Sequence, residues 1–310
     1  MKALTISTTT THVSEEPIVA CIGYFDGFHL GHQTLFNKTL ALAKSQNAKS
    51  AIITFDPDPW VILKGLHNVQ HLTTLEDRKA LAKAKGFDYW IALQFDETMA
   101  QQDPQDFITL LVNNNLVHLV CGYDFRFGHR GKGSAETLLA QSALPVSIME
   151  EFEYQDAKVS TTRIIAAIKD GDMNLANTLL GQPYGIKGTV VHGKRIGTQI
   201  GFPTANLKVD SEYVIPKMGV YAGTVDVDGQ HFGAMISIGY NPTVKDDDAV
   251  SIEGHLFDFS ANLYGKILTF YFVAYLRPEM KYTGLEPLIE QLKRDEVASR
   301  AILKRNASEK

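Results

Sequence analysis

Two histidines in a glycine-rich turn are the first residues whose types and spacing suggest chemistry. His29 and His32 are separated by Leu-Gly in the string G-Y-F-D-G-F-H-L-G-H, which begins at Gly23. Both imidazoles could donate to a triphosphate and stabilise the charge that develops on its α-phosphate and on the departing pyrophosphate. Such a reaction needs positioning and a metal-bound nucleotide, not a nucleophile from the protein. A lone histidine here would more simply cap a helix, but the string as a whole favours a phosphate site.

Two later segments suit the same site. Asp124 lies in the string G-Y-D-F-R-F-G, directly after an apolar run that ends at Cys121. The string S-T-T-R at 160–163 opens a predicted helix, where hydroxyls and a cation suit phosphate binding, although a simple N-cap is the default explanation for such a segment taken alone. The glycine-rich stretch 128–134 does not have the spacing of a P-loop, so we reject that interpretation.

A second group of polar residues follows a glycine-rich turn in the other half of the chain. Gly193 and Gly201 precede the string P-T-A-N, in which Thr204 and Asn206 offer two oxygen ligands. Magnesium takes few protein oxygens and completes its octahedron with phosphates and water, so this pair fits a magnesium nucleotide. A hairpin with a structural asparagine is the alternative. Further on, Glu253 lies on an alternating segment, where composition alone predicts an exposed strand carboxylate.

The elements that carry the first group alternate between strands and helices. Apolar runs at 18–22, 51–55, 90–93 and 116–121 alternate with segments of helical period at 33–45 and 76–85 and with a helix that opens at Asp103-Pro104. This order predicts an α/β, doubly wound parallel sheet that binds ligands at the carboxyl ends of its strands.

The elements that carry the second group are short alternating strands. They are predicted at 186–191, 219–227, 232–238, 251–257 and 267–275, followed by a helix at 285–303. Such strands indicate an antiparallel barrel or sandwich. The run Asp246–Asp248 is predicted to be a solvated loop. We predict two domains, at 1–184 and 185–310, since 310 residues are about twice a typical domain.

Composition narrows the class of protein. Apolar residues make up 45% and charged residues 21%, which is typical of a folded protein, and the net charge of −5 argues against binding nucleic acid by the overall field. Cys21 and Cys121 lie in apolar runs and are predicted to be buried, unreactive thiols. There is no leader-like apolar segment and no long apolar stretch, so we expect a cytoplasmic protein without a membrane segment.

These motifs, in this order, resemble the bacterial bifunctional riboflavin kinase and FMN adenylyltransferase (FAD synthetase) family over essentially the whole chain. The P-T-A-N string resembles the signature of riboflavin kinases, and the segments 238–243 and 251–258 match further parts of the family. The resemblance implies a Rossmann-like nucleotidyltransferase domain followed by an antiparallel β-barrel kinase domain with a terminal helix. ATP would be the co-substrate, Mg²⁺ the metal, and riboflavin, FMN and FAD the substrate, intermediate and product.

The resemblance also implies roles for individual residues. In the first domain His29 and His32 would stabilise the transition state and Phe55 would contact the flavin. The nucleotide site there would involve Gly23, Asp26, Gly27, Asp124, Ser160, Thr161, Thr162 and Arg163. In the second domain Thr204 and Asn206 would hold magnesium-ATP beside Gly193 and Gly201, and Glu253 would be the base. Arg277 would contact flavin or nucleotide.

Three positions depart from the family pattern. Ile165 stands where the S-S-T-x-x-R element has its arginine, Asp58 stands where the F-x-P-H-P string has histidine, and Thr198 stands where an arginine is expected. Because an alkyl group cannot replace a guanidinium at a phosphate, a monofunctional riboflavin kinase with a degenerate first domain remains an alternative. A third hypothesis is a non-catalytic flavin sensor. The presence of Thr204, Asn206 and Glu253, which the kinase reaction would use, argues against it. The sequence leaves the oligomeric state open.

Overall fold

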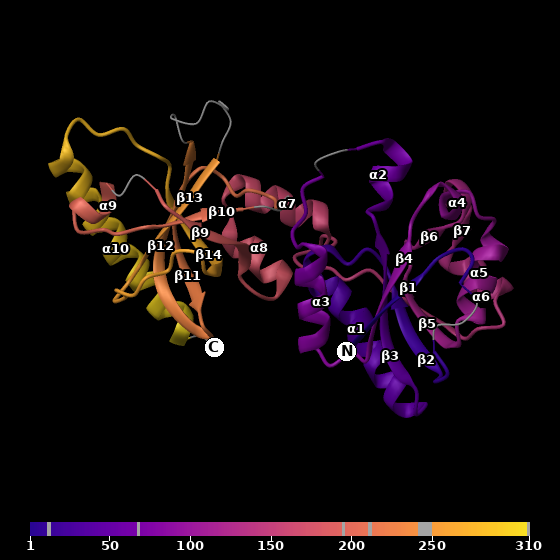
Figure 1. Cartoon of the computed structure of the whole chain (residues 1–310). Helices are drawn as coiled ribbons and strands as arrows, with labels where there is room; N and C mark the ends of the chain where they lie inside the picture. The colour runs from indigo at the N-terminus through magenta and orange to yellow at the C-terminus, as the bar shows by residue number, and fades with distance from the viewer. Residues whose placement is uncertain (11–13, 67–68, 194–195, 210–212, 241–249, 309–310) are drawn as a thin grey trace. The chain divides into compact units, whose positions relative to one another are not determined.

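The computed structural model describes residues 1–310 except 11–13, 67–68, 194–195, 210–212, 241–249 and 309–310. The chain forms two compact units, Met1–Thr161 and Thr162–Lys310, and each is described by itself (Figure 1). The domain boundary predicted at 184/185 falls where the first strand of the second unit begins. The predicted aspartate-run loop and the segment Asn241–Thr243 lie outside the described residues.

The first unit is built on a six-stranded parallel sheet, which confirms the predicted doubly wound α/β class. Its strand order is β1-β4-β3-β2-β5-β8. The strands are β1 (Lys2–Ile6), β2 (Ile18–Ile22), β3 (Lys49–Asp56), β4 (Tyr89–Gln94), β5 (Leu116–Gly122) and β8 (Val146–Met149), with a small hairpin of β6 (Arg126–Phe127) and β7 (Gly133–Ser134) after β5.

Helices cover both faces of this sheet (Figure 1). They are η1 (Asp26–Phe28), α1 (Leu30–Ser45), α2 (Pro59–Lys64), α3 (Leu75–Ala84), α4 (Glu97–Ala100), α5 (Pro104–Asn113), η2 (His129–Gly131) and α6 (Ala135–Gln141). Successive strand residues point to opposite faces. On β2, Ile18, Ala20 and Ile22 therefore pack with residues of α5 and α6, whereas Cys21 packs with residues of α1 and α3. The sequence of a strand that is buried on both faces is a continuous apolar run, so β2 could be predicted from the sequence.

Both cysteines are buried and unpaired, as predicted. Two strands of the sheet were not predicted. β1 is an edge strand whose residues are mostly exposed, and β8 has four half-buried residues, so neither carries a strong apolar signal.

The second unit is a closed antiparallel barrel, which settles the choice between barrel and sandwich. Its order is β10-β13-β12-β11-β14-β9, and β9 closes on β10. The strands are β9 (Tyr184–Val191), β10 (Ala205–Lys208), β11 (Gly219–Val227), β12 (Gln230–Tyr240), β13 (Val250–Leu256) and β14 (Ile267–Arg277). The short strand β10 was not predicted, because it follows directly on the glycine- and proline-rich turn.

In the described part of the second unit the helices are α7 (Thr161–Asp170, of which Thr161 closes the first unit), α8 (Met173–Leu180), α9 (Ile196–Gln199) and α10 (Leu285–Ser308). Asn177 of α8 donates to the carbonyl of Phe272 on β14 at 2.9 Å. The predicted C-terminal helix is α10, and its Ile289, Leu292 and Leu303 pack on a cluster that includes Met235 of β12. The barrel is thereby covered on one side by an amphipathic helix (Figure 1).

Candidate active sites

The histidine turn lies between β2 and α1, at the carboxyl end of a central strand. His29 is the N-cap of α1, and its Nδ1 accepts from the backbone amide of His32 at 3.4 Å. The two imidazole rings stack with centroids 3.5 Å apart and planes inclined by 20°. The structure thus brings the two predicted histidines together at the amino end of a helix, a position that favours anionic groups.

Burial keeps both histidines uncharged. His29 is 5% exposed, and burial together with the charge of Lys158 lowers its pKa to about 4. The pKa of His32 is held well below its usual value by burial, by His29 and by Arg78. The Nδ1 atom of His32 is buried without a hydrogen-bond partner. At neutral pH these groups are neutral imidazoles, which can donate to a phosphate without first losing a bound shell of water.

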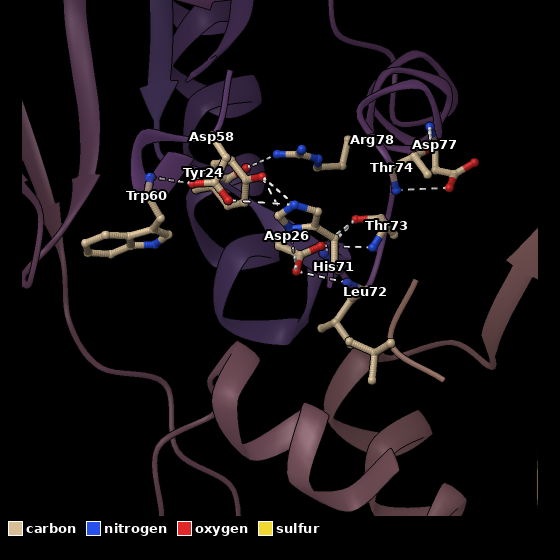
Figure 2. Close-up of polar contacts among 12 residues, drawn as sticks. Tyr24, Asp26, Asp58, Trp60, His71, Leu72, Thr73, Thr74, Asp77 and Arg78 are labelled. Carbon is tan, nitrogen blue, oxygen red and sulfur yellow. Dashed lines mark hydrogen bonds and ion pairs between the residues drawn. The ribbon is translucent and has the colours of Figure 1, made fainter. Parts of the chain in front are cut away.

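Asp26 holds this turn in place. Its carboxylate accepts from the amide of Leu72 at 3.0 Å and from the amide and hydroxyl of Thr73 at 2.9 and 3.0 Å (Figure 2). The hydroxyl of Thr73 in turn accepts from the amide of Gly27 at 2.8 Å. Arg78 donates to the carbonyl of Tyr24 at 2.6 Å. Both carboxylate oxygens of the predicted residue Asp26 are therefore occupied by hydrogen bonds within the protein. Thr73 and Arg78 position this turn, and neither was predicted from the sequence.

An aromatic cavity of about 540 Å³ opens in the same unit. Its aromatic lining is contributed by Tyr24, Phe55, Trp60, Phe95, Phe107 and Phe127. Asp124, Arg126 and Arg130 line it as well, and Asp124 is paired with Lys158 at 2.6 Å. The cavity can take a flat, apolar ring system with polar substituents, and it contains both Phe55 and Asp124 of the predicted site.

The predicted S-T-T-R segment lies at the start of α7. Ser160 precedes the helix, Thr161 is its first residue, and the division between the two units falls between Thr161 and Thr162. Arg163 and Ile165 are half-buried on this helix.

In the barrel, Glu253 faces the predicted magnesium ligands. Glu253 on β13 is paired in register with Asn206 on β10. Its Oε2 accepts from the hydroxyl of Thr204 at 3.0 Å, and its Oε1 accepts from the hydroxyl of Ser251 at 3.2 Å. The carboxylate is half-buried, so a hydroxyl of a substrate can still reach it. Ser251 was not predicted as part of this site.

The donors around Glu253 fit a hard cation. A Cβ at Gly193 would come within 2.3 Å of the side chain of Asn206, so the glycine lets this side chain lie against the backbone. Thr204 and Asn206 provide two neutral oxygens, and among the described residues no group of three or more His, Cys, Asp or Glu could hold a metal by itself. A site with so few protein ligands suits Mg²⁺ that arrives with a nucleotide.

The other predicted residues of the barrel are placed separately. Gly201 has a φ of +85°, which glycine adopts without strain, and it is exposed. Thr198 and Thr204 line a cavity of about 160 Å³.

Arg277 is engaged by Asp295 of α10. The guanidinium donates to both carboxylate oxygens at 2.7 to 3.1 Å. It also lines a cavity of about 530 Å³ with Glu279 and Tyr282, where the Tyr282 hydroxyl is buried without a hydrogen-bond partner. The predicted ligand contact is thus also the clamp between β14 and α10.

Comparison with known proteins assigns both halves of the chain. A family model described as FAD synthetase matches residues 11–163, and one described as riboflavin kinase matches residues 180–303. A bifunctional riboflavin kinase/FMN adenylyltransferase from Listeria monocytogenes is 39% identical over 94% of this chain and 95% of its own length. The chain belongs to the bifunctional riboflavin kinase/FMN adenylyltransferase family. The family predicted from the motifs is confirmed.

Further relatives agree over nearly the whole length. The protein of the same name from Bacillus subtilis is 36% identical over 95% of this chain and 96% of its own. A solved structure from Streptococcus pneumoniae, titled as a macrolide-efflux protein, is 32% identical, covers 96% of this chain and 98% of its own, and has a TM-score of 0.88. The fold described above is therefore that of a known structure. None of the helices in the described part of this chain has the length and apolarity needed to cross a membrane.

Proposed function

We propose that this chain makes FAD from riboflavin in two steps, first as a riboflavin kinase and then as an FMN adenylyltransferase. One observation carries the proposal: the stacked pair His29 and His32 lies within the part of the chain that matches the FAD synthetase model, and the hydrogen-bonded pair Thr204 and Glu253 lies within the part that matches the riboflavin kinase model. The kinase domain would be 185–310 and the adenylyltransferase domain 1–184. The partners are small molecules, and we place the enzyme in the cytoplasm.

In the kinase step, Glu253 is the base. It accepts the proton of the ribityl hydroxyl while that oxygen attacks the γ-phosphorus of ATP, and ADP leaves. The hydroxyls of Thr204 and Ser251 keep the carboxylate oriented at its two oxygens. Thr204 and Asn206 would hold Mg²⁺, which neutralises phosphate charge when bound. Gly193 and Gly201 supply backbone for the nucleotide, and Arg277, which lines a separate cavity of the barrel, contacts flavin or nucleotide.

In the adenylyl step, a phosphate oxygen of FMN attacks the α-phosphorus of ATP. The bond from that phosphorus to the bridging oxygen of pyrophosphate breaks, and pyrophosphate leaves with its charge. His29 and His32 donate to the phosphates as this charge develops. Gly23, Gly27, Ser160 and Thr161 of the first unit shape the nucleotide site, and Asp26 holds the turn through its own hydrogen bonds. The aromatic cavity with Phe55 takes the flavin ring, and Asp124 lies at its rim.

The alternative is a riboflavin kinase without adenylyl transfer. It is favoured by Ile165 on α7, because this residue cannot supply the phosphate contact of the arginine it replaces. The two functions differ in one product, so an assay separates them.

The test is product analysis with the full chain, ATP and MgCl₂, started in one run from riboflavin and in the other from FMN. FAD in both runs is the expected result. FMN that accumulates without FAD would establish the alternative, and no conversion by folded protein would overturn both. Pyrophosphate release in the second run provides an independent measure of the adenylyl step.

A further inference from the structure

Asp58, the residue that replaces the family's histidine, is buried beside the histidine turn. Its Oδ1 accepts from the amide of Trp60 at 2.8 Å and so caps α2. Its Oδ2 is buried without a hydrogen-bond partner. A buried carboxylate oxygen without a partner is costly, so the group that faces it matters.

That group is the imidazole of His71. Its Nε2 lies 3.7 Å from Oδ2 of Asp58, and its Nδ1 lies 4.0 Å from Oδ2 of Asp26. Figure 2 shows the ring between the two carboxylates, with the hydroxyl of Tyr24 at 3.3 and 3.4 Å from its nitrogens. His71 thus joins the start of α2 to the turn that carries His29.

The helix α2 needs such a tether. None of its residues is buried, so apolar packing does little to hold it in place. It nevertheless forms part of the aromatic cavity through Pro59, Trp60 and Leu63. The contact of His71 with Asp58 at the cap of α2 therefore links this wall of the cavity to the histidine turn.

We propose that His71 is a positioning residue for FMN, and that it supplies from a different segment the imidazole that the family carries at position 58. This inference rests on the proposed adenylyl transfer. The proposed role involves no contact between His71 and the reacting phosphates. It fixes the cavity wall that holds the flavin, so its loss weakens the binding of FMN in the ground state and the transition state alike.

The test is steady-state kinetics of FAD formation from FMN with the full chain carrying His71→Ala. We expect the KM for FMN to rise about tenfold with kcat changed less than about twofold, the pattern of lost uniform binding. His71→Gln, whose amide can still reach Asp58, should retain most of the wild-type KM. His71→Asn, which is shorter, should not. Asp58→Asn preserves the helix cap, and combining it with His71→Ala should add little to the effect of His71→Ala alone.

Two controls separate this role from general destabilisation. His118→Ala removes a histidine from β5 that bonds to Ser147, away from the cavity, and should leave the KM for FMN unchanged. Riboflavin phosphorylation by the same variants should keep its wild-type rate. If wild-type protein makes no FAD from FMN, the proposed function fails and this inference with it. If wild type makes FAD but His71→Ala behaves like His118→Ala, or lowers kcat alone, only this inference is overturned.

Discussion

The two candidate sites differ in the burial and the charge of their side chains. In the first unit the paired imidazoles are buried and neutral, and Asp26, the carboxylate of the same turn, is occupied by backbone and hydroxyl donors. In the second unit a half-buried carboxylate, Glu253, takes two hydroxyl hydrogen bonds and stays open on one side.

The difference fits the nucleophile that we propose for each step. A ribityl hydroxyl attacks poorly until its proton is removed, so the kinase site needs a carboxylate base. The phosphate of FMN already carries negative charge and needs no base, and the adenylyl site therefore needs only neutral donors that receive the charge of pyrophosphate. In the proposed mechanism, the protonation state of the attacking oxygen decides which of the two sites carries a base.

Replacing the base gives the largest expected effect. Glu253→Gln keeps the size of the side chain, and its amide oxygen can still accept the hydrogen bond from Thr204, but the amide cannot act as a base. We expect kcat for riboflavin phosphorylation to fall by about 10²–10⁴ while FAD formation from FMN is unchanged. Both rates are measured on the same preparation, and a parallel loss of both would contradict the division of labour between the units.

The corresponding substitution for the adenylyl step is His29→Asn. Asparagine is a good N-cap, so α1 keeps its start while the imidazole is lost. FAD formation from FMN should fall by about 10²–10³, with riboflavin phosphorylation unaffected. Chromatography of the flavins measures both activities. A normal rate of FAD formation would show that the stacked pair is structural.

Gly193→Ala probes how closely the kinase ligands are placed. The new Cβ would meet the side chain of Asn206 at 2.3 to 2.5 Å and push it from its position. A misplacement of this size costs up to about 10²-fold in rate, so we expect riboflavin phosphorylation to fall by about 10-fold or more. Gly229→Ala, in the turn between β11 and β12 and outside the site, is the control for a loop glycine, since none of the described residues lies within 4 Å of a Cβ there. Equal losses in both variants would contradict the role of Asn206.

The buried imidazoles also make the first unit sensitive to acid. Because the pKa of His29 is about 4 in the folded state and near 6.5 unfolded, the unfolded chain binds more protons between these values. Stability is then lost as the pH falls, by about 3 kcal/mol from this group between pH 7 and pH 4. Urea unfolding followed by tryptophan fluorescence tests this, since Trp60 and Trp90 both lie in the first unit. His29→Asn should flatten the dependence, and an equally steep curve would refute the assignment.

The smallest effect is expected from thiol reagents. Cys21 and Cys121 lie in the sheet of the first unit, and burial raises the pKa of each to about 12. Neither is a thiolate at neutral pH. Native protein treated with iodoacetamide should keep both activities, and mass spectrometry should find the thiols unmodified until urea is added. Selective loss of FAD synthesis would reveal a reactive cysteine near the histidine turn.

Sequence reasoning succeeded where the signal was local. The turn around His29 could be placed at the end of a strand because the apolar run before it and the helical period after it are contiguous in the chain. The partners of Asp26, in contrast, lie at Leu72 and Thr73, and no sequence spacing indicates that pairing. The same holds for Arg277, whose partner Asp295 lies on a separate helix.

The aromatic cavity could not be predicted from the sequence, because its lining residues are also distant from one another in the chain. Its lining comes from the histidine turn, β3, α2, α4, α5 and the β6–β7 hairpin, and each aromatic residue by itself is indistinguishable from core. Only Phe55 was singled out, and that through a resemblance to a motif. Cavities depend on tertiary packing, whereas motifs that bind phosphate are built from consecutive residues.

The closure of the barrel has a consequence for synthesis of the protein. β14 pairs with both β9 and β11, so the first strand of the barrel obtains one of its neighbours only after Ile267–Arg277 has left the ribosome. Until then β9 and β11 each have an unpaired edge, the kind of surface that invites association between chains. The barrel can therefore close only after nearly the whole polypeptide has been synthesised. A chain ended at residue 266 should aggregate in a sedimentation assay, and recovery of soluble monomer would show that the open barrel tolerates its edges.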